Sequence, residues 1–380
     1  MSTPTTLAHG TVGTPQEVLE LLAAVVRGES PGWPPAIEPA DVLRVAADQG
    51  LDVLVASGIA GLTTWPEAIK SPLAVTLRDA CVVEVVRERE LVRVLAALHE
   101  VHVEPLLVKG TALAYSLYAA AHLRHRIDTD LLVASVQVHH ATRALEALGY
   151  AKTAQNVGRL VSHQVAMVRL DAHGVWHAID IHWKVANPHV FANLLTFEEL
   201  AASAVALPAL GPHARTPAPA LALLVAAVHL AAHHAHHVRL IWLYDLHVLC
   251  SRLRPDEFDQ VVPLAKARGL ATVCSRGLHL ARRWFDTSVP ARVLAELDAV
   301  DAQSEEPARY VAGSVGKLGT LVSDLRTLPT WRTRAELLYE HAFPPADYML
   351  RSYRRSRRTW LPALYIHRMI TGGWRWLRQA

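Results

Sequence analysis

The chain has 380 residues, of which 51% are hydrophobic and only 19% are charged, so it can fill a large core. At ~150 residues per domain, this length predicts about two domains. The 38 Lys and Arg residues nearly balance the 35 Asp and Glu residues, which gives a formal net charge of +3. That balance argues against a general nucleic-acid-binding protein.

Cysteine usage and the N-terminal sequence predict a cytoplasmic protein. The three cysteines, Cys81, Cys250 and Cys274, form no CxxC motif and no even-numbered disulfide framework, which fits a reducing compartment. The N-terminal sequence shows no basic segment followed by an apolar one, so we expect no signal peptide. The most apolar stretch begins at Ala218 but is interrupted by His229, which favours a buried helix over a membrane span.

Residues 1–102 are predicted to form an N-terminal helical region. A helix is expected from Pro15 to Gly28, because proline suits the first helical turn and glycine often follows the last one. A second helix is expected up to Gly50. A longer helix is predicted to begin near the Ser71-Pro72 pair, where apolar residues start to recur at helical spacing.

Residues 103–207 change period and predict a small α/β core with a mixed sheet. Buried strands are expected in "VEPLLVKG" and "DTDLLVA", and helices in "TALAYSLY" and "QVHHATRALEALGY". Polar and apolar residues alternate in "GRLVSHQVAMVRL" and "GVWHAIDIHWKV". This alternation predicts two paired strands around the turn "DAHG".

Residues 208–380 are predicted to form a C-terminal helical region. The Thr216-Pro217 pair is a typical helix start. Helices are expected through "ALALLVAAVHLAAHH", "RLIWLYDLHVLCSRL", "PDEFDQVVPLAKARG" and "LATVCSRGLHLARRWF". The sequence therefore predicts an α+β fold, in which N-terminal and C-terminal helical regions flank a small mixed-sheet core.

Two carboxylates stand at the start of the strand predicted in "DTDLLVA". Successive side chains on a strand point to opposite faces, so Asp128 and Asp130 are expected to point the same way. Carboxylates held side by side repel each other, and a cation such as Mg²⁺ would compensate that repulsion. A solvated strand end or turn is the alternative, and the pair by itself does not decide between the two.

The residues around this pair favour a site that binds metal and phosphate. Upstream, Lys109 and Gly110 end a strand and Thr111 opens a helix, and such a turn lets backbone amides approach a phosphate group. Downstream, Asp180 and His182 are expected on one strand face. Three carboxylates in this order are typical of two-metal sites for in-line displacement at phosphorus.

These stretches resemble a known family. "LLVKGTALAYSLY", followed by "LRHRIDTDLLV" and "IDIHW", is similar to an uncharacterised bacterial nucleotidyltransferase family within the DNA polymerase beta-like superfamily. The histidine-rich stretch that follows extends the resemblance over roughly residues 85–250. Thr111 and Thr129 depart from the family pattern, but neither departure removes a carboxylate. The matching positions are Lys109, Gly110, Arg124, Asp128, Asp130, Leu131, Leu132, Val133, Asp180, His182 and Trp183.

The resemblance implies an Mg²⁺-dependent nucleotidyltransferase, with Mn²⁺ as an alternative metal. A nucleoside monophosphate would move from a nucleoside triphosphate, expected to be ATP, to a hydroxyl of a small molecule, a peptide or a protein, and pyrophosphate would leave. Asp180 could also accept the hydroxyl proton. The candidate metal ligands and catalytic residues are Asp128, Asp130 and Asp180, and the candidate phosphate-binding residues are Lys109, Gly110, Thr111, Arg124 and His182.

Several polar residues nearby have alternative interpretations. Arg126 has no counterpart in the family pattern and is expected to be a solvated surface residue. His229, His233 and His237 share one helix face. They could line the nucleotide pocket, bind zinc, or be half-buried partners of carbonyls and acids. Asp245 is a candidate partner of this kind and also a candidate catalytic residue.

The basic C-terminal tail leaves a different function open. "RRSRR" from Arg354, with Trp360, Trp374 and Trp376, could contact a membrane surface or an anionic substrate, or could be a solvated basic face. Two functional alternatives follow from the sequence. The chain could be a non-catalytic nucleotide-binding or partner-binding module on the same fold, or a peripheral membrane protein that works through this tail.

Overall fold

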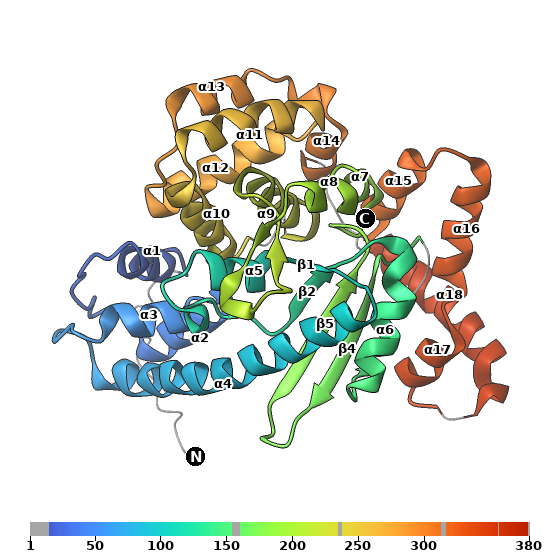
Figure 1. Ribbon diagram of the computed structural model, residues 1–380, viewed down its shortest axis with the longest axis horizontal. Helices are drawn as coiled ribbons and strands as arrows, with labels where there is room; N and C mark the ends of the chain where they lie inside the picture. The colour runs from blue at the N-terminus through green and yellow to red at the C-terminus, as the bar shows by residue number, and fades with distance from the viewer. Residues whose placement is uncertain (1–14, 154–159, 235–237, 313–316, 356, 379–380) are drawn as a thin grey trace, which may run out of the picture.

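The computed structural model describes residues 15–153, 160–234, 238–312, 317–355 and 357–378. Within these residues, helices surround a mixed sheet, which confirms the predicted α+β class (Figure 1). No described helix is long and apolar enough to cross a membrane. Short 3₁₀ segments link the elements at Ala121–Leu123, Ser135–Gln137, Pro208–Leu210, Ala302–Ser304 and Arg358–Trp360.

The sheet brings together strands from one stretch of the chain. In the described residues it has the order β1-β2-β5-β4-β3, in which β2 and β5 are parallel and the other neighbours are antiparallel. β4 and β5 pair around the turn after Leu170, as the alternation of their residues predicted. The strands are β1 (Leu106–Val108), β2 (Thr129–Leu132), β3 (Ala151–Lys152), β4 (Gln164–Leu170) and β5 (Trp176–His182).

The central strands are packed on both faces of the sheet. β1 and β2 carry buried apolar residues at successive positions, which point to opposite faces. Leu131 and Ile181 lie in a hydrophobic cluster with α4 (Glu67–Glu100) and α6 (Val138–Ala147). Leu132 faces the opposite way, into a larger cluster that also contains residues of the N-terminal and C-terminal helices. Since side chains alternate along a strand, Asp130 shares the face of Leu132.

The N-terminal helices follow most of the predicted boundaries. They are α1 (Pro15–Val26), α2 (Pro39–Gln49), α3 (Asp52–Ile59) and α4. Gly50 ends α2 with a left-handed φ of 68°, a conformation that favours glycine. Two predictions were wrong. α4 begins after the extended residue Pro66, and Pro72 lies inside it. α3 was missed because it is short and apolar on several sides, so it shows little helical periodicity.

The connections between core and C-terminal helices hold small elements that the sequence did not reveal. They are α7 (His189–Ala192), α8 (Phe197–Ala202), β6 (Val205–Ala206) and β7 (Arg215–Thr216). The helix predicted in "TALAYSLY" is present within the core as α5 (Lys109–Ser116). Thr216 is not a helix start, because it pairs with Val205 in the small two-stranded sheet. The following helix begins at Pro219 instead.

The C-terminal helices form two groups in space. α9–α14 gather at the top of the view, and α15–α18 lie beside the sheet on its right (Figure 1). Residues of α1–α3 and α9–α13 share one hydrophobic cluster, so the N-terminal helices and the first group of C-terminal helices build a common core. The bounds are α9 (Pro219–His234), α10 (Leu240–Arg252), α11 (Pro255–Ala267), α12 (Ala271–Phe285), α13 (Ala291–Asp298), α14 (Glu306–Ala312), α15 (Lys317–Thr327), α16 (Trp331–Ala342), α17 (Ala346–Ser352) and α18 (Leu361–Arg378).

Candidate active site

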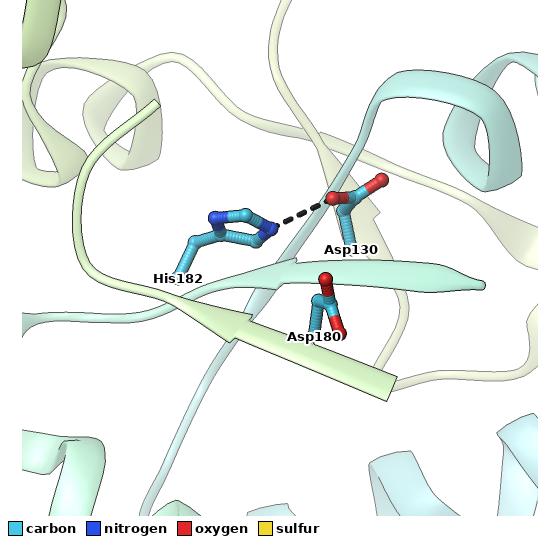
Figure 2. A group of neighbouring side chains, drawn as sticks. All are labelled: Asp130, Asp180 and His182. Atoms are coloured by element: carbon cyan, nitrogen blue, oxygen red, sulfur yellow. Dashed lines mark hydrogen bonds and ion pairs between the residues drawn. The ribbon is translucent and has the colours of Figure 1, made fainter. Parts of the chain in front are cut away.

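Two carboxylates meet on neighbouring strands. Asp130 on β2 lies directly opposite Asp180 on β5, and Leu132 lies opposite His182. Residues opposite each other in a sheet share a face, so Asp130, Asp180 and His182 project to the same side (Figure 2). One ligand atom from each of the three lies within 4.8 Å of the others. We refer to these three residues, with Asp128 and Lys109, as the acidic cluster.

Asp130 is the centre of the acidic cluster. Its Oδ1 accepts a hydrogen bond from Lys109 Nζ at 2.6 Å and lies 2.7 Å from His182 Nε2. Burial alone would raise the pKa of Asp130, but Lys109 and His182 outweigh it and hold that pKa well below its usual value. Burial and Lys109 lower the pKa of His182, so the imidazole is neutral and its Nε2 proton faces the carboxylate.

The other two carboxylates carry charge that is not balanced. Burial, followed by repulsion from Asp130 and Asp128, raises the pKa of Asp180 to about 7. Burial and Asp130 also raise the pKa of Asp128. Lys109 is the cation that hydrogen-bonds to this group of carboxylates, and its charge and that of Arg124 lower the pKa of Asp128 without cancelling the rise. This donor set suits a divalent cation with oxygen ligands such as Mg²⁺, because the cation would remove the repulsion that raises these pKa values.

The three residues whose potential ligand atoms lie close together differ from the three predicted metal ligands. They include His182 in place of Asp128. Asp128 precedes the first residue of β2, and its backbone carbonyl accepts a hydrogen bond from Thr111 Oγ1 at 3.3 Å. Asp128 nevertheless lies close enough to contribute to the raised pKa of Asp180. Asp130, Asp180 and His182 thus lie at distances that suit ligands of one metal, and Asp128 lies within electrostatic range of the two other carboxylates.

Lys109 and Gly110 are the first two residues of α5, directly after β1, and they have different neighbours. Lys109 has a φ of 56°, which is rare for a residue with a side chain and often marks a functional site. Its ammonium group reaches Asp130 from this position. A Cβ at Gly110 would lie 3.4 Å from Nη2 of Arg124. This is an ordinary van der Waals distance, so Arg124 does not exclude a side chain at Gly110, and the role of Gly110 in leaving room for a phosphate stays a prediction.

Arg124 is bound within the protein. Its Nε and Nη2 donate to the two oxygens of Asp245 on α10, each at 2.7 Å, and Tyr118 donates to the same carboxylate. Burial lowers the pKa of Arg124, but Asp245 and Tyr118 outweigh it and raise that pKa. Asp245 was a candidate partner of the histidines and a candidate catalytic residue, and here its hydrogen bonds come from Arg124 and Tyr118. The pair joins the loop before β2 to a C-terminal helix.

Arg126 is buried, so the prediction of a solvated surface residue was wrong. Only 9% of it is exposed, and its guanidinium donates to the carboxylate of Glu84 on α4 and to the carbonyl of Ala121. It also lies 5.3 Å from the ring centroid of Tyr115. Arg126, two residues before Asp128, is thus tied to α4, because a buried guanidinium needs a counter-charge and hydrogen-bond acceptors.

The histidine cluster and the tail are only partly described. The ring of His229 packs edge-on against Trp242, with centroids 5.8 Å apart. The side chains of His233 and His237 lie outside the described residues, as do those of Trp374 and Trp376. In the tail, Trp360 is 47% exposed, and the guanidinium of Arg355 lies over its ring.

Sequence reasoning missed a polar contact to the acidic cluster. Gln164 Nε2 donates to Asp180 Oδ2 at 2.6 Å, and Asn187 Nδ2 donates to Gln164 Oε1 at 3.3 Å. The strand pairing predicted around "DAHG" could have found Gln164, because the observed register places it opposite His182. Asn187 gave no signal, since it lies beyond the end of β5.

A comparison with known families adds independent information. A family model described as an uncharacterised nucleotidyltransferase matches residues 35–286. The match covers every candidate site residue named above and ends shortly after α12. No curated protein matches the chain.

Proposed function

This chain belongs to the family of uncharacterised nucleotidyltransferases, and from that premise we propose that it transfers a nucleoside monophosphate from a nucleoside triphosphate to an acceptor hydroxyl. The bond between the α-phosphorus and the acceptor oxygen forms, the α–β phosphoanhydride bond breaks, and pyrophosphate leaves. Family membership supports nucleotidyl transfer, and the acidic cluster supports a divalent metal, for which we propose Mg²⁺, with Mn²⁺ as a substitute.

One observation carries the proposal. Asp130 and Asp180 are direct neighbours across parallel strands, and Asp128 lies close to both. A structural role would be expected to match each carboxylate with a cation or with enough donors, yet the pKa values of Asp128 and Asp180 are raised. Carboxylates held in repulsion on a shared strand face are the arrangement that a metal–phosphate complex requires.

The protein groups have separate tasks in this proposal. Asp128, Asp130 and Asp180 would hold the metal, which would supply positive charge to neutralise the charge that develops on the transferred phosphoryl group. Lys109 contributes a mobile positive charge that can move from Asp130 Oδ1 to a phosphate oxygen. His182 fixes the orientation of Asp130 by donating to the same oxygen.

Asp180 is the group that we propose as proton acceptor. In the metal-free protein, burial and the neighbouring carboxylates raise the pKa of Asp180 to about 7, and a bound cation would lower that pKa, so that the ionised carboxylate could accept the hydroxyl proton. Its carboxylate lies on a different strand from Asp128 and Asp130, so it can face the acceptor while they face the nucleotide. The proposed nucleotide is ATP, and the proposed acceptor is a small molecule, a peptide or a protein side chain.

A nucleotide screen tests the proposal directly. Thermal melting of the full chain with each nucleoside triphosphate, with and without Mg²⁺, should show a metal-dependent rise in Tm for at least one of them. Mass spectrometry of the protein and of candidate acceptors should then show the added mass of a nucleoside monophosphate, and phosphate assays should show pyrophosphate. Absence of any metal-dependent nucleotide binding would overturn the proposal.

A non-catalytic nucleotide-binding module is a second candidate, and one contact favours it. Lys109 and His182 already satisfy Asp130 Oδ1 without a metal. Under this alternative the nucleotide would bind and raise Tm, but no pyrophosphate would form with any acceptor. The same screen separates the two candidates, because only the enzyme yields adduct and pyrophosphate together.

A further inference from the structure

Gln164 lies beside the acidic cluster without being a part of it. It is the first residue of β4, opposite His182, and the next residue but one, Ala166, lies opposite Asp180. Its Nε2 donates to Asp180 Oδ2 at 2.6 Å. One oxygen of Asp180 is therefore engaged by an amide, which leaves the other oxygen for a metal or a proton.

The direction of this hydrogen bond is fixed by a chain that begins at a backbone amide. The backbone N–H of His163 can only donate, and it donates to Asn187 Oδ1 at 2.9 Å. Asn187 must therefore turn its Nδ2 towards Gln164 Oε1, 3.3 Å away. Gln164 must in turn present its Nε2 to Asp180. Both amide orientations thus follow from one obligatory donor.

The segment that carries His163 is held by helices beyond the family match. Glu340 on α16 accepts the backbone N–H groups of Leu160 and Val161 at 2.9 and 3.0 Å. Asp324 on α15 accepts the backbone N–H of His189, whose Nε2 lies 2.9 Å from the carbonyl of Leu160. Leu160 and Val161 also pack against a small hydrophobic cluster formed by Leu321, Leu328 and Leu337.

We propose that Gln164 is a positioning residue for Asp180, and that Asn187 and helices α15 and α16 hold Gln164 in the orientation that donates to the carboxylate. This inference rests on the proposed function, because it assigns Asp180 to the metal site. An oriented donor on one oxygen restricts rotation of the carboxylate, so the free oxygen faces Asp130. The C-terminal helices outside residues 35–286 thereby support the site.

The first test removes the donor and keeps the shape. Gln164→Met has nearly the same length but no amide, so packing is retained while the hydrogen bond is lost. Titration of the full chain with Mn²⁺, followed by electron paramagnetic resonance, should show an apparent Kd raised by about tenfold, the usual effect of losing an outer-shell partner of a metal ligand. In a turnover assay, kcat should fall by a similar factor while KM for the nucleotide changes less than threefold.

The second test releases the side-chain amide of Gln164 from its fixed orientation. Asn187→Asp keeps the acceptor for the backbone N–H of His163 but removes the donor to Gln164, so Gln164 can turn its Nε2 away from Asp180. The Kd for Mn²⁺ should rise as in Gln164→Met. Asn193→Asp is the matched control, because Asn193 is exposed and its side chain accepts a hydrogen bond from Lys184, with no described contact to Gln164 or Asp180. It should leave the Kd unchanged.

The outcomes separate the inference from the function on which it rests. If the wild-type chain binds no Mn²⁺, the proposed metal site fails and the inference falls with it. If the wild-type chain binds Mn²⁺ and folded Gln164→Met, checked by circular dichroism, binds it equally well, the positioning role is wrong and the proposed function stands. Glu340→Ala should raise the Kd in the same direction by a smaller factor, and an unchanged Kd would remove α16 from the inference.

Discussion

Two buried groups of charged residues include near neighbours in the sequence, Arg124 and Asp128, yet the two groups are built differently. Arg124 and Asp245 form a closed pair in which one guanidinium meets one carboxylate through two hydrogen bonds. The acidic cluster sets Asp128, Asp130 and Asp180 against the single ammonium of Lys109. The first group is matched in charge, and the second carries an excess of negative charge.

The difference between the two groups indicates that Arg124 stabilises the fold and that Asp180 is available for chemistry. The neighbouring carboxylate of Asp245 raises the pKa of Arg124 and so favours its charged form. Excess charge raises the pKa of Asp180 and so disfavours its charged form. A carboxylate whose charged form is disfavoured in the metal-free protein is a candidate for binding a cation. A charge-matched, hydrogen-bonded pair is a candidate for holding helices and strands together.

The largest expected effect comes from removing the excess charge. Asp128→Asn combined with Asp130→Asn leaves too few anionic ligands for a divalent cation. Metal-dependent nucleotide binding should weaken by at least about a thousandfold, or ~4 kcal/mol. Isothermal titration with and without Mg²⁺ measures the loss. Full metal-dependent binding in this variant would remove the acidic pair from the site.

Breaking the matched pair should act on stability instead. Asp245→Ala leaves Arg124 buried without its counter-charge, which typically costs ~3–5 kcal/mol of the free energy of unfolding. Urea denaturation measures this cost. The paired change Arg124→Met with Asp245→Leu should recover much of the stability, because both charges then leave together. Undiminished stability in Asp245→Ala would show that the pair is not structural.

A single change at Asp180 should separate binding from chemistry. Asp180→Asn removes one charge and the proposed proton acceptor, so turnover should fall by at least about a hundredfold. Nucleotide affinity should stay within about tenfold, or ~1.4 kcal/mol, because Asp128 and Asp130 remain. Steady-state kinetics with a separate binding titration tests both halves. Wild-type turnover in Asp180→Asn would refute the role of this residue.

The smallest expected effect is a pH dependence that only the acidic cluster should show. Because the pKa of Asp180 in the metal-free protein is about 7, its carboxylate is protonated below that pH and a metal must displace the proton. Mn²⁺ affinity should therefore fall by up to about tenfold per pH unit below 7 and level off above it.

The sign of the stability effect follows from the same raised pKa. A carboxyl group with a raised folded-state pKa contributes stability at low pH that is lost as the pH rises from about 4 to about 7. The metal-free protein should lose stability across this window, and Mn²⁺ should restore it. Melting curves at several pH values measure this. A metal affinity that is flat from pH 5 to pH 8 would contradict the raised pKa.

The sequence was enough to predict the elements that carry the site, because their signals are local. Alternation predicted β4 and β5, and the apolar run after Asp130 predicted β2. Proline and glycine marked α1 and α2. Elements with weak local signals were missed, such as α3, whose apolar residues fall on several faces, and the two-residue strands β6 and β7.

The candidate residues were predictable as residue types, and their partners were not. Asp130 and Asp180 could be picked out because carboxylates next to buried strands are unusual. The sequence could not show that Arg124 meets Asp245, because the two lie 121 positions apart and belong to different regions. The sequence also did not predict that the buried guanidinium of Arg126 pairs with the carboxylate of Glu84 on α4.

The amino-acid sequence by itself determined the α+β class, the strand that carries Asp130 and the strand that carries Asp180, since periodicity depends only on near neighbours along the chain. Only the tertiary structure decided that β2 and β5 are adjacent and parallel, and therefore that the two carboxylates face each other. It also decided that Gln164 donates a hydrogen bond to Asp180 and that Arg124 donates its hydrogen bonds to Asp245. The physical reason is that charge balance depends on distances between residues far apart in sequence, and packing of the core sets those distances.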